Sequence, residues 1–550
     1  MYEQIKDINP DQLSDGDVRP VMILLLGFIE QLMSKVDLLE KELQASRDEI
    51  NKLKGGNARP QFTGSSKVSK NISSGGKEKS KKEHKNKNLK DKTTALESDE
   101  VVIVKFDKSQ LPPDAVFKGY KSYNQQDIEI KRCNKHFLFE TWYSPSIGKT
   151  FRPSWPEDRF PGHYGLGVRS LLSVFRHLAD VTEGTLHKLM KGFGIKISTG
   201  TISSLLKAEH AWAVEERHSI FKAGLANDTP KQMDTTSTKQ KGCNMATHII
   251  TDPFFTVFYT TATKSRLDCL NVLQGCPKEG IKLLWHEGIK EPLLKAKLGA
   301  SHPESLARLM MDNPLLTLTE FDALMQREAP QIFKRKKVMC TMREEMALAY
   351  YRYQQDYPPI KLLLSDAAAE YLRIALYHAL CWIHDARHYN ILSPKLAWTA
   401  KKLEDFKDKY WVFYRKLSDY TQKIKEEQQQ CKEQLEKDFD TLFVADTQYP
   451  DLDKAIERTI ATKKELLLVL EFTDLPLHNN EAELAARRVV RKRDISLHTW
   501  SDWGTQLRDA FMSIIQTAIR LNISPYQYIC DRISRNYQMD SLASIIAKRN

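Results

Sequence analysis

The chain has 550 residues and a formal net charge of +12, from 83 Lys and Arg against 71 Asp and Glu. Its length predicts several domains rather than one. The positive charge predicts a polyanionic partner such as nucleic acid, although one lysine-rich segment supplies part of the excess. The eight cysteines contain no CxxC pair, which excludes a disulfide framework and a four-cysteine zinc site. The apolar run at 21–29 is too short to span a bilayer and no secretory signal opens the chain, so we expect a cytoplasmic protein and no membrane partner.

Residues 1–54 are expected to form a helix with a coiled-coil heptad. The repeating positions alternate in steps of three and four, which produces a narrow apolar stripe on one face of the helix. These heptad positions are Met22, Leu25, Ile29, Leu32, Val36, Leu39, Leu43, Ser46, Ile50 and Leu53. We expect them to pair copies of the chain, with a single amphipathic helix packed on its own protein as the alternative.

Two segments of different composition follow this helix. Residues 55–98 are rich in Lys, Ser and Gly and contain little that a core could bury, so they are expected to be disordered. Such a segment either slides along DNA phosphates or only links its neighbours. Residues 99–157 contain the β-rich runs "EVVIVKF" and "HFLFETWY" and are expected to form a small strand-rich domain.

Residues 158–225 predict a helix-turn-helix domain that binds DNA. Gly192 and Gly194 permit a turn between two amphipathic helices, and Ser198 or Thr199 can cap the second one. The second helix of such a motif enters the major groove, so residues at its start are candidates for DNA contact. They are Thr199, Thr201 and Ser203. Many helix pairs have this outline without binding DNA, and that alternative stays open.

From residue 226 onward the pattern is that of an α+β or α/β multidomain fold. Three β-rich runs within 228–264 predict an antiparallel meander. The run 360–365 predicts a buried strand, followed by Asp366 and then a helix. A helical and highly charged stretch at 395–475 precedes a C-terminal part that is again helical.

Three acidic residues occupy comparable places in these elements. Asp234 lies on the first strand of the meander, Asp366 at the end of the buried strand, and Glu483 in the first turns of a helix. Three such groups repel one another unless a cation joins them, and their hard oxygen atoms favour Mg²⁺ or Mn²⁺. Two ions about 4 Å apart can hold the attacking and leaving oxygens of a phosphodiester. From spacing alone, a turn capped by Asp234 and an ion pair between Glu483 and Arg487 remain alternatives.

The surroundings of Glu483 form an extended motif. Asn479 and Asn480 come first, a two-residue spacer containing Glu481 follows, and Arg487 comes four residues after Glu483. The stretches "RKRD", "SDWG" and "LNISPYQYI" continue the pattern toward the C-terminus.

Two further motifs precede this one in the chain. "SDAAAEY" contains Asp366, and "CWIHDARHY" contains Cys381 and His384 in a C-x-x-H arrangement. Asp234 opens a run that ends in "TKSRL". In this order, and together with the helix-turn-helix segment, the motifs resemble the insertion sequence 66 family of transposases, a branch of the DDE transposases. The resemblance covers roughly 160–270 and 355–535.

The resemblance implies a ribonuclease-H-like core in two parts, 226–394 and 476–545. The helical insertion 395–475 separates them, and an extra helical segment at about 271–355 lengthens the first part. The resemblance also implies that Asp234, Asp366 and Glu483 are catalytic and bind two Mg²⁺ or Mn²⁺ ions. Residues expected to support this site are Cys381, His384, Asn479 and Asn480.

Three departures from the family pattern qualify these expectations. Thr235 follows the first Asp where the family has an acidic residue. Cys133 stands alone where many members carry a cysteine-rich segment, so no zinc is expected, and half a zinc site is only the alternative reading of Cys381 and His384. The third departure is the extra segment at about 271–355.

The function that the resemblance implies is DNA transposition, by cleavage at the transposon ends and strand transfer into target DNA. The partners would be double-stranded DNA, both terminal inverted repeats and target, a second copy of the chain, and small helper proteins, in the bacterial cytoplasm near the nucleoid. Residues expected to contact DNA phosphates are Arg487, Arg491, Lys492, Lys264 and Arg266. Two rivals stay open: a catalytically silent or host-adopted DNA-binding protein of the same descent, and a metal-dependent nuclease without strand transfer.

Overall fold

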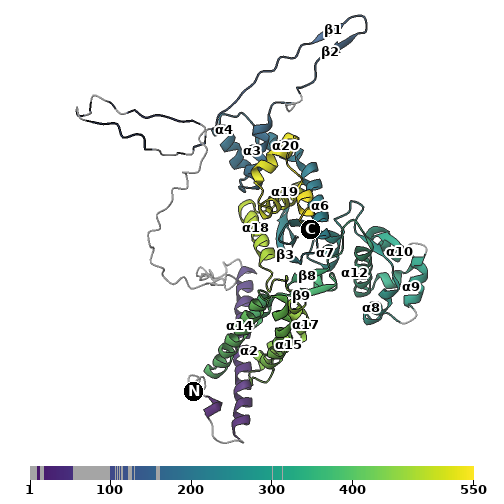
Figure 1. Cartoon of the computed structure of the whole chain (residues 1–550). Coiled ribbons are helices and arrows are strands. Elements are labelled where there is room, and N and C mark those ends of the chain that lie inside the picture. Colours follow the sequence, from purple (N-terminus) through teal and green to yellow (C-terminus); the bar gives the residue numbers. More distant parts are fainter. Residues whose placement is uncertain are drawn as a thin grey trace. The chain divides into compact units, whose positions relative to one another are not determined.

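The computed structural model describes residues 9–12, 18–53, most of 100–156, 162–299, 302–311 and 314–549 (Figure 1). The lysine-rich linker expected at 55–98 lies outside the described residues. The chain divides into two units, which are described separately. The first comprises Met1–Gln61, Ser154–His187 and Ile197–Asn550, and the second comprises Phe62–Pro153 and Lys188–Lys196.

A mixed five-stranded sheet lies at the centre of the first unit, in the order β5-β4-β3-β8-β9. Strands β3, β4 and β5 form the antiparallel meander that the sequence predicts, and β8 and β9 run parallel to β3. Their bounds are β3 Lys231–Gln240, β4 Cys243–Thr251, β5 Thr256–Thr261, β8 Leu362–Ser365 and β9 Tyr377–Leu380. Lys241 and Gly242 join β3 to β4 with positive φ angles of 49° and 80°, as a two-residue hairpin turn requires.

Strand β9 corrects one expectation. The chain does not enter a helix directly after Asp366, but forms the short 3-10 turn η4 (Ala369–Tyr371) and then β9. The backbone of Leu362–Ser365 pairs in parallel with that of Tyr377–Leu380, and this pairing stabilises an extended conformation over a stretch that local pattern alone reads as helix. The helix α13 (Trp382–Asn390) begins only after β9.

Two C-terminal helices and one earlier helix pack on the meander. These are α6 (His210–Ala226), α18 (Asn480–Ser496) and α19 (Asp502–Arg520). Ala485 and Ala486 of α18 contribute to a core cluster with Ile249 and Phe258 of the sheet, because small side chains allow a helix to approach closely. The hydroxyls of Thr517 and Ser513 accept the backbone N–H groups of Thr256 and Phe258 at 3.1 and 3.0 Å, so α19 satisfies the edge of β5.

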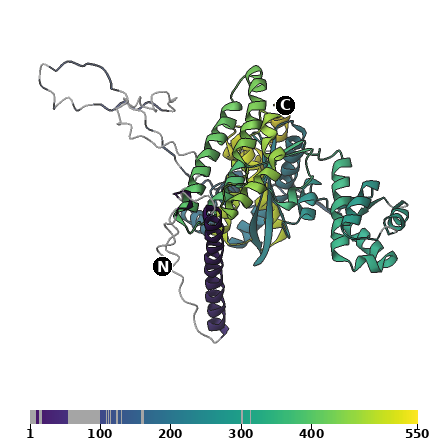
Figure 2. The ribbon, with the colours of Figure 1, turned by 90° about the horizontal axis from the view of Figure 1, so that it is seen from below.

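The segment between α7 and β8 is largely helical, as expected, and adds a small hairpin. Strands β6 and β7 pair antiparallel there, and Figure 2 shows the helices gathered together. The elements are α7 Arg266–Leu273, β6 Lys282–Leu284, η3 Glu287–Ile289, α8 Lys290–Lys295, α9 His302–Met311, β7 Leu315–Thr317, α10 Leu318–Glu328, α11 Pro330–Phe333 and α12 Lys336–Tyr353. The capping box of Thr317 and Glu320 begins α10.

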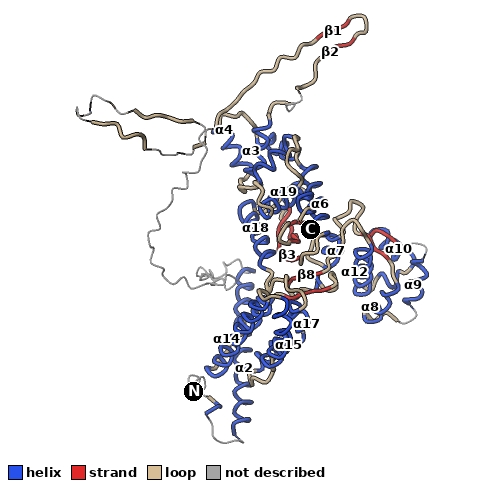
Figure 3. The backbone as a smooth tube through the Cα atoms, in the orientation of Figure 1, coloured by secondary structure: helices blue, strands red, loops and turns tan. Residues whose placement is uncertain are grey.

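The insertion expected at 395–475 is built of helices (Figure 3). They are α14 Ala397–Tyr420, α15 Lys425–Leu442, α16 Pro450–Ala461, α17 Lys463–Leu466 and the 3-10 helix η5 Leu467–Leu470. Trp382 of α13 packs its ring against Tyr410, Phe413 and Phe439 of the insertion. Its indole N–H also donates to the carbonyl of Leu466 at 2.9 Å. One aromatic core thus joins the insertion to the helix that follows β9.

Helix α2 (Val18–Leu53) packs on the start of α14 through one face. Leu26 is buried, and the Glu30 carboxylate accepts the backbone N–H of Lys395 at 2.7 Å and the Thr399 hydroxyl at 2.9 Å. The heptad positions lie mostly elsewhere on the helix. Those between 46% and 61% exposed are Leu25, Leu32, Val36, Leu39, Leu43 and Ile50. The helix thus packs on its own protein through Leu26 and Glu30, as the alternative expects, while these heptad positions are exposed and pairing between copies stays a prediction.

Four helices occupy 158–225: α3 Leu166–His177, α4 Glu183–Gly192, α5 Thr199–Ala208 and α6. The Ser198 hydroxyl accepts the backbone N–H of Thr201 at 3.1 Å, so Ser198 is the cap of α5. Gly194 has a φ of 74° in the turn before it, a conformation that glycine adopts without strain. Ile202 and Leu206 are buried, as the spacing predicts.

The second unit contains fewer strands than expected for 99–157. Among its described residues, only β1 (Trp142–Ser144) and β2 (Lys149–Phe151) pair, in a short hairpin. The apolar run 101–105 is irregular and exposed. β-branched composition alone does not produce a strand here, because no neighbouring strand pairs with this run.

In the described part of the chain, no helix combines the length and hydrophobicity that crossing a membrane requires.

Asp385 joins three helices and generates a prediction about pH. Its carboxylate accepts the hydroxyls of Thr459 at 2.8 Å and Tyr410 at 3.0 Å, and burial raises its pKa to about 6 from the usual 3.8. Between these values the folded chain holds a proton that the unfolded chain has released, so this contribution to stability falls as pH rises from about 4 to 6. The Asp385→Asn variant has no such proton to lose. Its free energy of unfolding, relative to that of the parent chain, should therefore be higher at pH 7 than at pH 4, by up to about 3 kcal/mol.

Chemical denaturation at the two pH values checks this, and Asp451→Asn at the exposed start of α16 is the matched control. If the free energy of unfolding of Asp385→Asn differs from that of the parent chain by the same amount at both pH values, the raised pKa of Asp385 is contradicted.

Candidate active site

The sheet places Asp234 and Asp366 at the same level. Gln232 of β3 pairs with Leu364 of the parallel strand β8, and each acidic residue comes two positions later. Side chains two positions apart on a strand share a face, and neighbouring strands are about 4.8 Å apart. Asp234 is half-buried on β3, and Asp366 follows the last residue of β8. Asp366 thus lies just beyond the end of β8, beside the strand that carries Asp234.

Asn479 joins the start of α18 to β3, the strand that carries Asp234. Its side-chain amide donates to the carbonyl of Met233, the residue before Asp234, at 2.8 Å. Its backbone N–H donates to the Cys381 sulfur at 3.3 Å, and the Trp382 backbone N–H donates to the carbonyl of Leu477 at 3.0 Å. The segment before α18 thus lies between β3 and the start of α13.

Glu483 follows one turn later, and its carboxylate is held by α13. Oε1 accepts from the Arg387 guanidinium at 2.9 Å and lies 3.6 Å from the His384 Nε2. Glu481 serves another purpose, because its Oε2 accepts from Arg520 at 2.7 Å. Glu483 thus contacts α13, whereas Glu481 contacts α19.

Electrostatics link the three acidic residues. Burial, together with the carboxylates of Asp366 and Glu483, raises the pKa of Asp234 to about 6 against the opposing effects of the Thr235 N–H and Arg387. The negative charges of these carboxylates disfavour ionisation of Asp234, because like charges repel. Repulsion of this kind is relieved when a cation binds between the groups.

The carboxylates of Asp234, Asp366 and Glu483 are suitable ligands for a divalent cation, but they are not arranged as a complete metal site in this conformation. No group of three His, Cys, Asp or Glu side chains in the described residues has the arrangement of a metal site. The Glu483 carboxylate instead lies 2.9 Å from the Arg387 guanidinium. Carboxylate oxygens suit Mg²⁺ or Mn²⁺, so the residues fit such an ion provided that Glu483 exchanges its arginine partner for it.

Cys381 and His384 lie at the start of α13, next to Asp366 and Glu483. The Cys381 thiol is buried and accepts the N–H of Asn479, and burial raises its pKa. Burial also lowers the pKa of His384. A buried thiol with a raised pKa is a poor metal ligand. This geometry favours the supporting role, in which Cys381 holds Asn479 and His384 contacts Glu483.

The basic residues expected to contact DNA fall into two groups. Arg487 and Arg491 are exposed on α18, and Lys264 is exposed before α7. Within the described part of the chain none of these three has an ion-pair partner.

Lys492 and Arg266 differ from the expectation. The Lys492 ammonium is buried, contacts Asp180 and the carbonyl of Arg176 at 2.8 and 2.7 Å, and has its pKa lowered to about 8 by burial. Arg266 lies 3.5 Å from Glu345 and donates to the carbonyl of Leu372 at 2.8 Å. Both side chains hold elements of the fold together, so they are not free to meet phosphate in this conformation.

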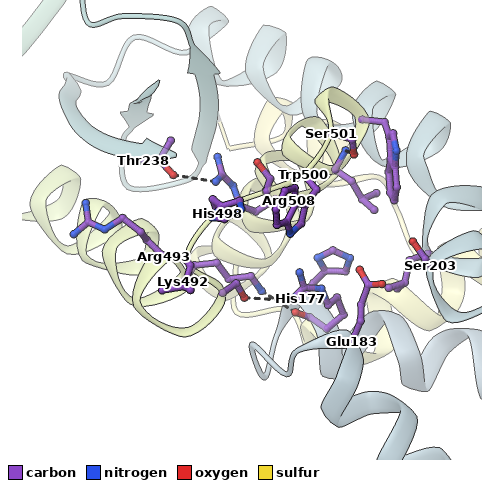
Figure 4. A pocket seen from close by; sticks show the side chains of 18 residues that line it. His177, Glu183, Ser203, Thr238, Lys492, Arg493, His498, Trp500, Ser501 and Arg508 are labelled. Atoms are coloured by element: carbon purple, nitrogen blue, oxygen red, sulfur yellow. Dashed lines mark hydrogen bonds between the residues drawn. The ribbon is translucent and has the colours of Figure 1, made fainter. Parts of the chain in front are cut away.

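A cavity of about 220 Å³ lies between the helices of 158–225 and the C-terminal helices (Figure 4). Ser203 lines this cavity rather than standing free on the surface, whereas Thr199 is exposed and Thr201 is half-buried. Lys492 and Arg508 lie in the same wall, and Arg508 donates to the Thr238 hydroxyl at 3.1 Å. Polar contacts across this cavity connect α18 and α19 to β3.

Arg387 is the residue of this site to which the sequence assigns no role. It lies inside the "CWIHDARHY" motif, three residues after His384, and so on the same face of a helix. That spacing is the signal that would have placed it beside the same carboxylate.

Comparison with known proteins bears on this region. Residues 352–507 match the family described as "Transposase IS66 family". This part of the chain is similar to that family. The match contains Asp366 and Glu483, the insertion between them and the start of α19, while Asp234 lies before it. The match supports a transposase-like function.

One relative comes from Sinorhizobium fredii (strain NBRC 101917 / NGR234) and is described as "Uncharacterized protein y4jO". It is 29% identical over 336 residues, which cover 60% of this chain and 100% of that protein. No solved structure matches the chain.

The Asn479 contact generates a prediction. Asn479→Ala should destabilise the protein by about 1–3 kcal/mol, because it leaves the buried Met233 carbonyl without its donor. Asn480→Ala is the control: this neighbour is half-buried, and no hydrogen bond of its side chain is present in the described residues. Thermal unfolding of both variants measures the difference. Equal losses for the two would show that the Met233 contact does not hold α18.

Proposed function

We propose that the protein is a DNA transposase in which Asp234, Asp366 and Glu483 bind two divalent metal ions. The observation that carries the proposal is the meeting of β3, β8 and the start of α18, which brings these carboxylates within mutual electrostatic influence. The family match across Asp366 and Glu483 supports it independently.

The sheet supports a ribonuclease-H-like core. A three-stranded antiparallel meander followed by two parallel strands gives the order β5-β4-β3-β8-β9, which is the layout of that fold. Its acidic residues lie on the central strand and on the strand beside it, and the third comes from a helix packed on the sheet. The insertion interrupts the core between Asp366 and Glu483 without separating them in space.

Each residue of the site would have a distinct task. Asp234, Asp366 and Glu483 would hold Mg²⁺ or Mn²⁺, which supplies activation of water and stabilisation of charge on the phosphodiester oxygens. Asn479 fixes the helix that carries Glu483. Arg387 neutralises Glu483 until a cation replaces it, which lowers the cost of three neighbouring negative charges in the free protein.

DNA would approach along the exposed basic residues near these carboxylates. Arg487 and Arg491 lie one and two turns after Glu483 on α18 and thus on the same helical face. Lys264 adds positive charge at the start of α7. The exposed Thr199 at the start of α5 is suited to contact with the terminal inverted repeats, in the manner of a helix-turn-helix.

Substitution of Glu483 tests the reaction. Glu483→Gln should lower cleavage and strand transfer at least about 100-fold, because it removes one charged ligand of the ions. Glu481→Gln should retain activity, since Glu481 contacts Arg520 instead. Incubation with labelled transposon ends, Mg²⁺ and a target plasmid measures both steps.

The products separate the rivals. Joined product supports the transposase, nicking alone supports a nuclease, and a mobility shift without either supports a silent DNA-binding protein. Unchanged activity of Glu483→Gln would refute the proposed site.

We further propose that α2 pairs two copies of the chain as a coiled coil. The helix already packs on its own protein through Leu26 and Glu30, yet its heptad positions remain exposed. A long apolar stripe on a helix is buried when a second helix packs along it.

The double variant Leu32→Glu/Val36→Glu should therefore convert a dimer to a monomer. Leu38→Glu, on an equally exposed residue outside the heptad positions, should leave the dimer intact. Light scattering over a range of concentrations gives the mass of each. A parent chain that is monomeric throughout would refute the pairing.

A further inference from the structure

A second cavity lies between the candidate active site and the helical insertion. Its volume is about 310 Å³, at the low end of the range for ligand sites. One wall comes from the loop after β8 and from α13, and the other from α16 and α17 of the insertion. The polar residues that line it are Asp366, His384, Asp385, Arg387, His388, Arg458 and Thr462.

The charged residues of this lining are the acidic Asp366 and Asp385 and the cationic Arg387 and Arg458. Asp385 is buried and both its oxygens accept hydroxyl groups of the protein. Arg458 is exposed and contacts the His388 Nδ1 at 3.3 Å. In the described part of the chain Arg458 has no carboxylate partner. Arg387 reaches the cavity from the opposite side, from α13.

The cavity shares residues with the acidic site. Asp366 lines it directly, and Arg387 lines it while donating to Glu483. A ligand held by Arg387 and Arg458 would thus lie beside the carboxylates. The planar guanidinium groups of arginine match the oxygen atoms of a phosphate.

We propose that this cavity binds a backbone phosphodiester of the DNA strand next to the reacting bond, with Arg458 and Arg387 as its ligands. The proposal rests on the proposed function, because DNA must pass Asp366 for the carboxylates to act on it. It assigns the insertion a direct part in holding DNA, through a residue of α16 that lies far from the acidic residues in sequence.

Binding of modified DNA tests the proposal with the full-length protein. Duplexes of the terminal repeat that flanks the gene are prepared with a neutral methylphosphonate at one backbone position at a time, and binding is measured with Ca²⁺ in place of Mg²⁺. In the parent chain, neutralisation of one or two phosphates next to the cleaved bond should weaken binding about tenfold. Arg458→Ala should bind unmodified DNA about tenfold more weakly and be insensitive to methylphosphonate at those same positions.

Lys454→Ala is the matched control. Lys454 is exposed one turn earlier on α16 and does not line the cavity, so its loss removes the same charge from the same helix. This variant should show the same methylphosphonate pattern as the parent chain. Circular dichroism of both variants should give the parent melting temperature, because both side chains are exposed.

The outcomes are distinct. If Arg458→Ala keeps the parent pattern, or if Lys454→Ala loses it equally, the phosphate site is overturned. If the pattern depends on Arg458 but the parent chain neither cleaves nor joins DNA in Mg²⁺, the phosphate site stands and the transposase function fails. If the protein cleaves and joins DNA but no methylphosphonate position has an effect that depends on Arg458, the transposase function stands and the phosphate site fails.

Discussion

The hydrogen bond from the Asn479 amide to the Met233 carbonyl is the contact on which the candidate site depends. It joins the N-terminus of α18 to the strand that carries Asp234, over a separation of more than two hundred residues. Without it, α18 would be held to the sheet by its buried alanines and valine and by Arg493, which donates to the Ser237 carbonyl of β3 at 2.9 Å. With it, the third carboxylate has a defined position relative to the first. The backbone N–H of the same residue contacts Cys381, so a single asparagine connects the sheet, α13 and α18.

Helix α13 connects the acidic site with the insertion. One face carries Trp382 and Asp385 into the aromatic core of the insertion, while His384 and Arg387 contact Glu483. This nine-residue helix therefore contacts the insertion on one side and Glu483 on the other. A shift of the insertion would move Arg387, the cation that pairs with Glu483. This arrangement explains why a long helical insertion can interrupt the core without isolating it from the chemistry.

The sequence predicts the meander well, because alternation of side chains is a local signal, while the roles of Asp234, Asp366 and Glu483 stay predictions. Predictions from the sequence are wrong or missing where contacts between residues distant in the chain determine the structure. Strand β9 is extended because β8 pairs with it. Lys492 and Arg266 resemble free surface cations in the sequence, yet each meets an acidic residue that only the fold brings near. Arg458 carries no sequence signal, since its relation to Asp366 exists only once the insertion has folded back. The heptad positions of α2 are exposed because the helix packs beside the start of α14 through Leu26 and Glu30 instead.

The late position of α18 has a consequence for biosynthesis. During translation the meander and β8 emerge first, and the insertion must emerge before Glu483 exists. The nascent protein can thus assemble its sheet with two acidic side chains in place while lacking the third. Long-range closure of this kind is slow compared with local helix formation. A chain that ends before α18 consequently lacks both Glu483 and the Asn479 contact that holds this helix to β3.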